Sequence, residues 1–317
     1  MRAVKNKYCN KYRFGWLIFL SPFILVGKSE DLSVRQTIER SIPYIELKGQ
    51  EWIKKNKCVS CHQINTMIWS LSLAKQKGFI VSEKLRSWID WSVEESLKNN
   101  EKGKVVGRLN KEGVAQILFA DLEIESSQRE KLINLLALDQ KKDGTWDAGG
   151  QLPAQKRPVK ETSLVSSSWI ALSARQKVSQ ASIPTIRAQK EAESIEWYVV
   201  NLLLSSRNGD GKVNTFTNKL KEFQNSDGGW GWLVNESSDA LGTGMALYAL
   251  EYAKSKKTSE ERTRAIEFLI RTQKTDGTWP VKATKRKKRE KVEETSTYWG
   301  TAWAIIGLTS GFSDNEH

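Results

Sequence analysis

The chain has 317 residues, 39% of them hydrophobic, with a formal net charge of +13 and a mean hydropathy of −0.52. These values exclude a disordered chain and allow one large or two ordinary domains with a real hydrophobic core. Long stretches rich in Lys, Glu, Leu, Ala and Ser do not alternate apolar with polar residues, and prolines are few. We therefore expect an all-α protein.

The first 27 residues differ from the rest. Positive charges without any acid precede an apolar block from Phe14 to Gly27. This order is typical of a secretory signal, although an uncleaved signal anchor has the same order. Removing the five cations of this segment would lower the charge from +13 to about +8. We expect an exported protein, periplasmic or extracellular, with a signal over 1–27 and one domain over 28–317.

A predicted helix over Val34–Lys57 leads into Cys58-Val59-Ser60-Cys61-His62. Two thiols at this spacing can form thioethers with both vinyl groups of haem, and the adjacent His62 can ligate the iron. A redox dithiol or a structural disulfide remains an alternative, but neither needs the histidine, and the sequence lacks a thioredoxin-like setting. A zinc site would need two further ligands that the sequence does not offer. The motif predicts covalently bound haem c.

The opposite face of the iron has few possible ligands in the mature chain, namely Met67, Met245, lysines and His317. Met67 follows His62 too closely to reach around the haem without looping out, so we expect it to pack beside the ring or in the core. If neither methionine binds, the iron is five-coordinate. A group of tryptophans around the motif is expected to be core and to surround haem with apolar side chains: Trp52, Trp69, Trp88 and Trp91.

Three later segments share the pattern Q-x-x-D-G-x-W, over 140–146, 224–230 and 273–279. Each follows a stretch with helical periodicity, over Arg129–Asp139, Asn214–Phe223 and Ser259–Thr272. The Asp-Gly pair is a turn and helix-stop signal. After each turn a second helix begins with small and hydroxyl residues, at Glu161, Ser237 and Glu294. The sequence thus predicts repeated αα-hairpins, with one hairpin that lacks the motif around Ile183–Leu204.

These turns resemble the QW repeats of squalene-hopene cyclases and of the prenyltransferase and squalene oxidase repeat family, over about 34–310. The resemblance implies an α/α toroid in which inner helices line a central cavity, and it implies a structural role for the Gln and Trp of each turn: Gln140, Trp146, Gln224, Trp230, Gln273 and Trp279. The haem motif would replace the first turn. The chain also resembles exported proteins that join such repeats to C-x-S-C-H-x-x-x-x-M-x-W, matched here from Cys58 to Trp69.

The catalytic groups of the resembled enzymes are missing from the sequence. The cyclases use a D-x-D-D acid cluster, and here Asp239 stands alone at a predicted helix start, where we expect capping and a pKa lowered by the helix dipole. The zinc ligands of the prenyltransferases cannot be assembled either, since His62 and His317 are the two histidines. The sequence leaves enzyme activity undecided and favours a non-enzyme.

We expect an electron carrier or a haem-linked binding or sensing protein with a redox partner protein. The alternative is a cyclase-like enzyme or a binding protein for a hydrophobic isoprenoid in the toroid cavity. A third possibility is a structural repeat scaffold with a Cys58–Cys61 disulfide. The basic run 285–291 is interpreted as a solvated loop or a docking site for an acidic surface. Nucleic acid is not an expected partner of an exported chain, and a membrane is expected only through an uncleaved signal.

Overall fold

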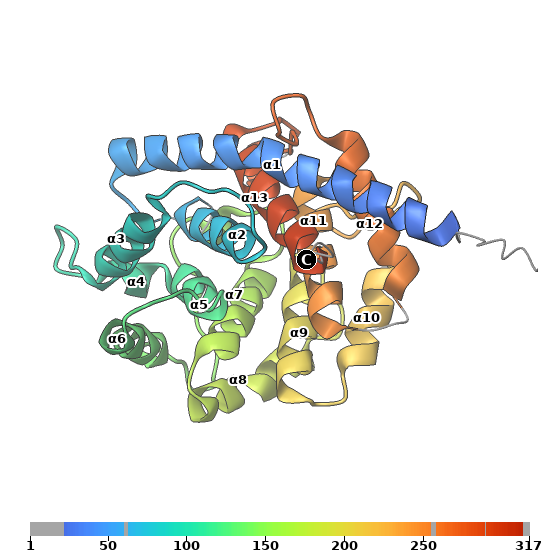
Figure 1. The fold of residues 1–317 in the computed structure, drawn as a ribbon. Coiled ribbons are helices and arrows are strands. Elements are labelled where there is room, and N and C mark those ends of the chain that lie inside the picture. Colours follow the sequence, from blue (N-terminus) through green and yellow to red (C-terminus); the bar gives the residue numbers. More distant parts are fainter. Residues whose placement is uncertain (1–21, 60–62, 255–257, 289, 313–317) are drawn as a thin grey trace, which may run out of the picture.

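The computed structural model describes residues 22–59, 63–254, 258–288 and 290–312, and over these residues it contains helices and isolated bridges but no strands (Figure 1). The all-α prediction is confirmed. The helices are α1 (Pro22–Asn56), α2 (Ile64–Gln76), α3 (Leu85–Leu97), α4 (Val106–Leu109), α5 (Lys111–Phe119), α6 (Ser126–Ala137), η1 (Leu152–Ala154), α7 (Val159–Ser173), α8 (Gln176–Ala188), α9 (Ile195–Asn208), α10 (Val213–Glu222), α11 (Ala240–Ala253), α12 (Ser259–Thr272), η3 (Arg286–Lys288) and α13 (Glu294–Gly311).

Six of these helices form a closed inner ring. Each contacts the next in the order α2, α5, α7, α9, α11, α13 and back to α2. Inner helices are buried nearly all round, as α9 and α13 show, because each is surrounded by neighbours on the ring and by its outer partner. The outer helices α1, α3, α6, α8, α10 and α12 bury one face each. The predicted hairpin without the motif is present as α8 and α9.

The three Q-x-x-D-G-x-W turns tie neighbouring hairpins together, as the resemblance implies. Each glutamine amide donates to the glycine carbonyl oxygen of its own turn and to a backbone carbonyl oxygen of the next outer helix, at Val178, Glu261 and Thr37. Each tryptophan indole donates back to the end of the preceding helix. The structural role of Gln140, Trp146, Gln224, Trp230, Gln273 and Trp279 is therefore confirmed.

The third turn closes the ring. Gln273 donates to the carbonyl oxygen of Thr37 in α1, 236 residues away, at 2.8 Å. Gly277 has φ +81° and lies so close to α1 that a Cβ would overlap the backbone carbonyl oxygen of Arg40. Both features demand glycine, the first through backbone conformation and the second through contact.

Gly277→Ala is expected to lower the free energy of unfolding by about 2–4 kcal/mol, because the positive φ and the overlap with α1 act together. Gly211 has a similar φ of +73° but no heavy atom within 4 Å of an added Cβ. Gly211→Ala therefore separates the two causes and should cost about 1 kcal/mol. Equal losses in urea titrations of the two variants would contradict tight packing at the ring closure.

The N-terminal part of α1 overlaps the predicted signal. α1 begins at Pro22, whereas the predicted helix began at Val34 and the predicted signal ended at residue 27. Residues 1–21 lie outside the described residues, so the signal stays a prediction. A search of the described helices finds none with the length and apolar character needed to cross a membrane.

Candidate functional site

The predicted haem motif lies in the loop that joins outer helix α1 to inner helix α2. The helix ends at Asn56, and Lys57 takes a positive φ of 45° that turns the chain. Cys58 is exposed, and its carbonyl oxygen accepts a hydrogen bond from the Trp52 indole at 3.0 Å. Val59 is buried. The motif thus occupies the same kind of outer-to-inner turn that carries Q-x-x-D-G-x-W in three later hairpins.

The described part of this loop fits attachment of a bulky group. A thiol at an exposed turn can carry a large substituent without displacing packed side chains, and Cys58 meets this condition. Partial burial of the thiol raises its pKa. Cys61 and His62, the second thiol and the proposed iron ligand, lie outside the described residues, as does His317.

The two methionines considered as sixth ligands are buried in the core. Met67 in α2 packs its sulfur against the backbone of α1, where a Cβ on Gly49 would overlap it. Met245 is fully buried in α11. Of the tryptophans near the motif, Trp69 and Trp88 are buried as expected, whereas Trp52 and Trp91 are only partly buried. Met67 therefore packs in the core as expected, and ligation of the iron by either methionine would require a rearrangement of the core.

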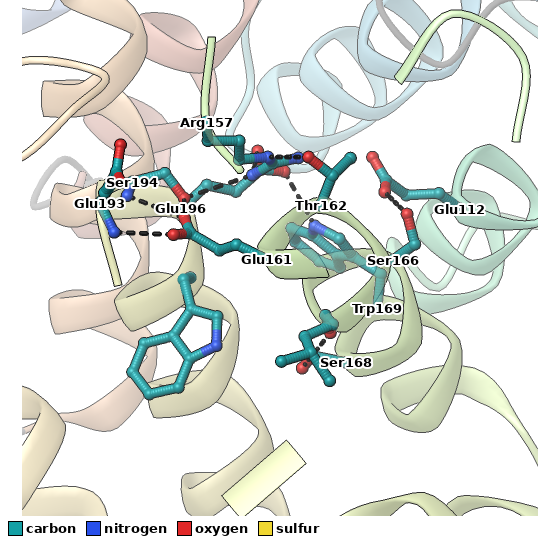
Figure 2. Close-up of polar contacts among 12 residues, drawn as sticks. Glu112, Arg157, Glu161, Thr162, Ser166, Ser168, Trp169, Glu193, Ser194 and Glu196 are labelled. Atoms are coloured by element: carbon teal, nitrogen blue, oxygen red, sulfur yellow. Dashed lines mark hydrogen bonds and ion pairs between the residues drawn. The ribbon is translucent and has the colours of Figure 1, made fainter. Parts of the chain in front are cut away.

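A second site, which the sequence reasoning missed, lies where inner helices α5, α7 and α9 begin (Figure 2). Arg157, just before α7, forms a fully buried ion pair with Glu196 of α9, with Nη1 and Oε2 2.8 Å apart. The Arg157 Nε donates to Thr162, and the Trp169 indole donates to the other Glu196 oxygen at 3.1 Å. Two charges without solvent contact are costly to bury unless they are paired, and Arg157 keeps one buried nitrogen, Nη2, without a hydrogen-bond partner among the described residues.

Glu112 and Glu161 complete this buried polar site. Glu161 accepts hydrogen bonds from the backbone N–H groups of Glu193 and Ser194, which orients the start of α9. Glu112 accepts only one described hydrogen bond, from the Ser166 hydroxyl. Burial and repulsion from Glu196 raise the pKa of Glu112 to about 7, although Arg157 and the Ser166 hydrogen bond oppose the shift. Glu112 can therefore hold or release a proton near neutral pH.

The sequence does contain a signal for this site. Acidic residues recur in the first turn of the inner helices, at Glu112, Glu161, Glu196 and Glu294. Carboxylates are favoured at these positions by the helix dipole, so any one of them looks ordinary. Only the ring, which brings the starts of α5, α7 and α9 together near Arg157, makes a cluster of Glu112, Glu161 and Glu196.

The prediction for Asp239 was correct in role and wrong in the direction of its pKa. Asp239 caps α11 by accepting from the N–H of Gly242 at 2.8 Å, and it also accepts from the N–H of Trp232. Desolvation of the carboxyl group outweighs these hydrogen bonds and raises its pKa to about 6. The helix dipole lowers the pKa of a carboxyl at this position, but the cost of burying the charged form is larger.

Aromatic side chains from five of the six inner helices meet beside the buried polar site. Their ring centroids lie 5.1–6.2 Å apart, mostly edge to face, which is contact distance for aromatic pairs. Trp169 belongs to both groups, because its indole donates to Glu196. At this level the toroid is packed with side chains. The members of this aromatic axis are Trp69, Phe119, Trp169, Tyr248, Tyr252 and Trp303.

No protein-family model matches the chain, and no curated protein matches it. Among solved structures it is similar to a variant of type II terpene cyclase MstE from Scytonema in complex with merosterolic acid A, with 9% identity and a TM-score of 0.59 over 90% of this chain and 99% of that one. A protein from Actinoplanes is 13% identical, with a TM-score of 0.54 over 78% and 90% of the two chains. At these identities the likeness shows the fold alone, and the chain is a cyclase-like α/α toroid.

Proposed function

We propose that this protein is an exported c-type haem protein that works in electron transfer or in haem-linked binding or sensing. The observation that supports this proposal most is the position of C-x-x-C-H in the loop from α1 to α2, at a turn where Cys58 is exposed. In this proposal Cys58 and Cys61 hold haem c by thioethers and His62 ligates its iron. Bound haem would supply a one-electron redox couple.

The chain's own residues would position the attachment loop. The Trp52 indole donates to the carbonyl oxygen of Cys58 and so fixes its position. The next residue, Val59, is buried and anchors the loop. The helix on each side of the loop packs against α13 as well, so the loop is held at both ends by the ring. Export, a periplasmic or extracellular location and a redox partner belong to the same proposal, because haem c attachment to an exported chain serves chemistry outside the cytoplasm.

The test is expression with the native N-terminus in a host that matures c-type cytochromes. We expect a pyridine haemochrome spectrum of haem c and a haem-staining band that survives denaturing electrophoresis. Cys58→Ala combined with Cys61→Ala should abolish this band while the far-ultraviolet circular dichroism stays helical. Cys9→Ala is the matched control, since this third cysteine lies in the predicted signal and should not affect the stain.

Two outcomes would contradict the proposal. One is a purified wild-type protein without haem in which mass spectrometry finds Cys58 and Cys61 joined in a disulfide. The other is haem that is lost on denaturation, which would show binding without thioether bonds. The first outcome would favour the structural scaffold or the redox dithiol.

A second candidate is a binding protein or cyclase-like enzyme for a hydrophobic isoprenoid. The observation that favours it is a buried acid with a raised pKa, Glu112, close to the aromatic axis. The close packing of that axis argues against this candidate, because a ligand would have to displace the rings. Organic extraction of the purified protein followed by mass spectrometry tests this candidate, and a stoichiometric co-purified isoprenoid would support it.

A further inference from the structure

The loops that lead into neighbouring inner helices place positive charge on both sides of the haem motif. Inner helix α2 lies between α13 and α5 in the ring. The loop before α2 therefore lies between the loop before α13, with the basic run 285–291, and the segment that leads through α4 into α5, whose α3–α4 loop carries Lys98, Lys102 and Lys104. The ion pair between Lys48 of α1 and Glu294 of α13, at 2.9 Å, fixes this neighbourhood.

Most of these cations have no acidic partner. Lys98 pairs with Glu95 and Lys288 pairs with Glu293. Within the described residues no ion pair forms at several exposed lysines on this end of the molecule, among them Lys54, Lys55, Lys57, Lys102, Lys104 and Lys287. We call these six lysines the basic face. Three of them are within four residues of Cys58.

The α3–α4 loop is built to present its charge outward. A bridge between Asn99 and Val105 closes a short hairpin, and the Asn100 side chain accepts from the backbone N–H groups of Lys102 and Lys104. These hydrogen bonds fix the backbone and leave both lysine side chains exposed. The ordered backbone reduces the reorganisation that is needed when a partner binds these lysines, and Glu101 is the one exposed acid within this hairpin.

We propose that the basic face docks an acidic surface of a redox partner protein and brings it to the haem edge. This inference rests on the proposed function. A protein is favoured over a membrane by the direction of α1, which runs from residue 22 to the haem loop as one helix of roughly 50 Å. The predicted signal or anchor thus lies at the far end of α1 from the basic face. Exposed lysines attract acidic groups at physiological salt, and the attraction weakens as the salt concentration rises.

The experiment measures binding of the full chain to fluorescein-labelled poly-L-glutamate at 20 mM and 150 mM salt. The test variant carries Lys54→Glu, Lys55→Glu, Lys102→Glu and Lys104→Glu. The control variant carries the same number of reversals at the other end of the ring, Lys75→Glu, Lys84→Glu, Lys212→Glu and Lys254→Glu. We expect at least about tenfold weaker binding for the test variant and a much smaller loss for the control. Equal losses in the two variants would overturn the docking proposal.

Two further measurements distinguish this proposal from its alternatives. In the first, binding to vesicles that contain anionic lipid is measured. If the wild type binds these vesicles more tightly than poly-L-glutamate and the test variant does not bind them, the basic face is a membrane site and the protein partner is overturned. Once the bound haem has been reduced, its oxidation by ferricyanide should become slower as salt is added. At low salt the oxidation should also be slower in the test variant than in the wild type, whereas the control variant should match the wild type. If haem is absent while the poly-L-glutamate result holds, the proposed function fails and the basic face stands as a docking site.

Discussion

Replacing Arg157 by Met is expected to lower the free energy of unfolding by about 3–5 kcal/mol, because it leaves the Glu196 carboxylate buried without its counter-charge. The Arg157 guanidinium is fully buried, and its position over the Trp232 ring at 5.3 Å adds an interaction that Met keeps only as packing. Denaturation in guanidinium chloride at pH 7, followed by tryptophan fluorescence, measures the loss.

The double variant Arg157→Met with Glu196→Gln provides the decisive comparison. It removes both charges and keeps an acceptor for the Trp169 indole, so most of the stability should return. An exposed pair serves as the matched control, and Glu294→Gln, which breaks the exposed ion pair with Lys48, should change stability by less than about 1 kcal/mol. A double variant as unstable as the single one would show that packing, and not charge, causes the loss.

The helical hairpins could be predicted because their signals are local. Apolar periodicity, the Asp-Gly stop and the hydroxyl-rich helix starts all lie within a few residues of the element they define, and Ser259–Thr272 coincides with α12. The ring closure was available only through the family resemblance. Gln273 and Thr37 are separated by 236 residues, and no periodicity in the sequence pairs them.

The buried polar site could not be predicted because its energetics depend on burial. Glu112, Arg157 and Glu196 come from three separate segments, and each alone looks like a helix-start acid or a loop cation. Asp239 is a similar case. Its capping contact is local and could be predicted, but the desolvation that raises its pKa depends on the folded surroundings and could not. For the haem motif the chemistry is local, and the structure adds the position of its loop in the ring.

The second large effect is a pH-dependent stability that originates at Glu112. Its pKa is raised to about 7 in the folded protein, from about 4.5 in an unfolded chain. The folded state therefore binds more protons between these values, so stability is greatest below pH 4.5 for this group and falls as the pH rises toward 7. Glu112→Gln keeps an acceptor for Ser166 and cannot ionise. As the pH rises from 4.5 to 8, the free energy of unfolding of the variant should increase by about 3 kcal/mol relative to that of the wild type.

The difference in free energy of unfolding between Glu112→Gln and the wild type, taken at each pH, isolates the effect of Glu112 from that of the other titrating groups. Asp239, with a pKa raised to about 6, contributes in the same direction but is present in both proteins, so its effect cancels. Glu123→Gln removes a highly exposed carboxylate and should give a difference that does not vary with pH in this way. Urea titrations at half-unit pH steps measure both. A flat difference for Glu112→Gln would mean that water or a bound group solvates this carboxyl, and would redirect the search for a ligand to the start of α5.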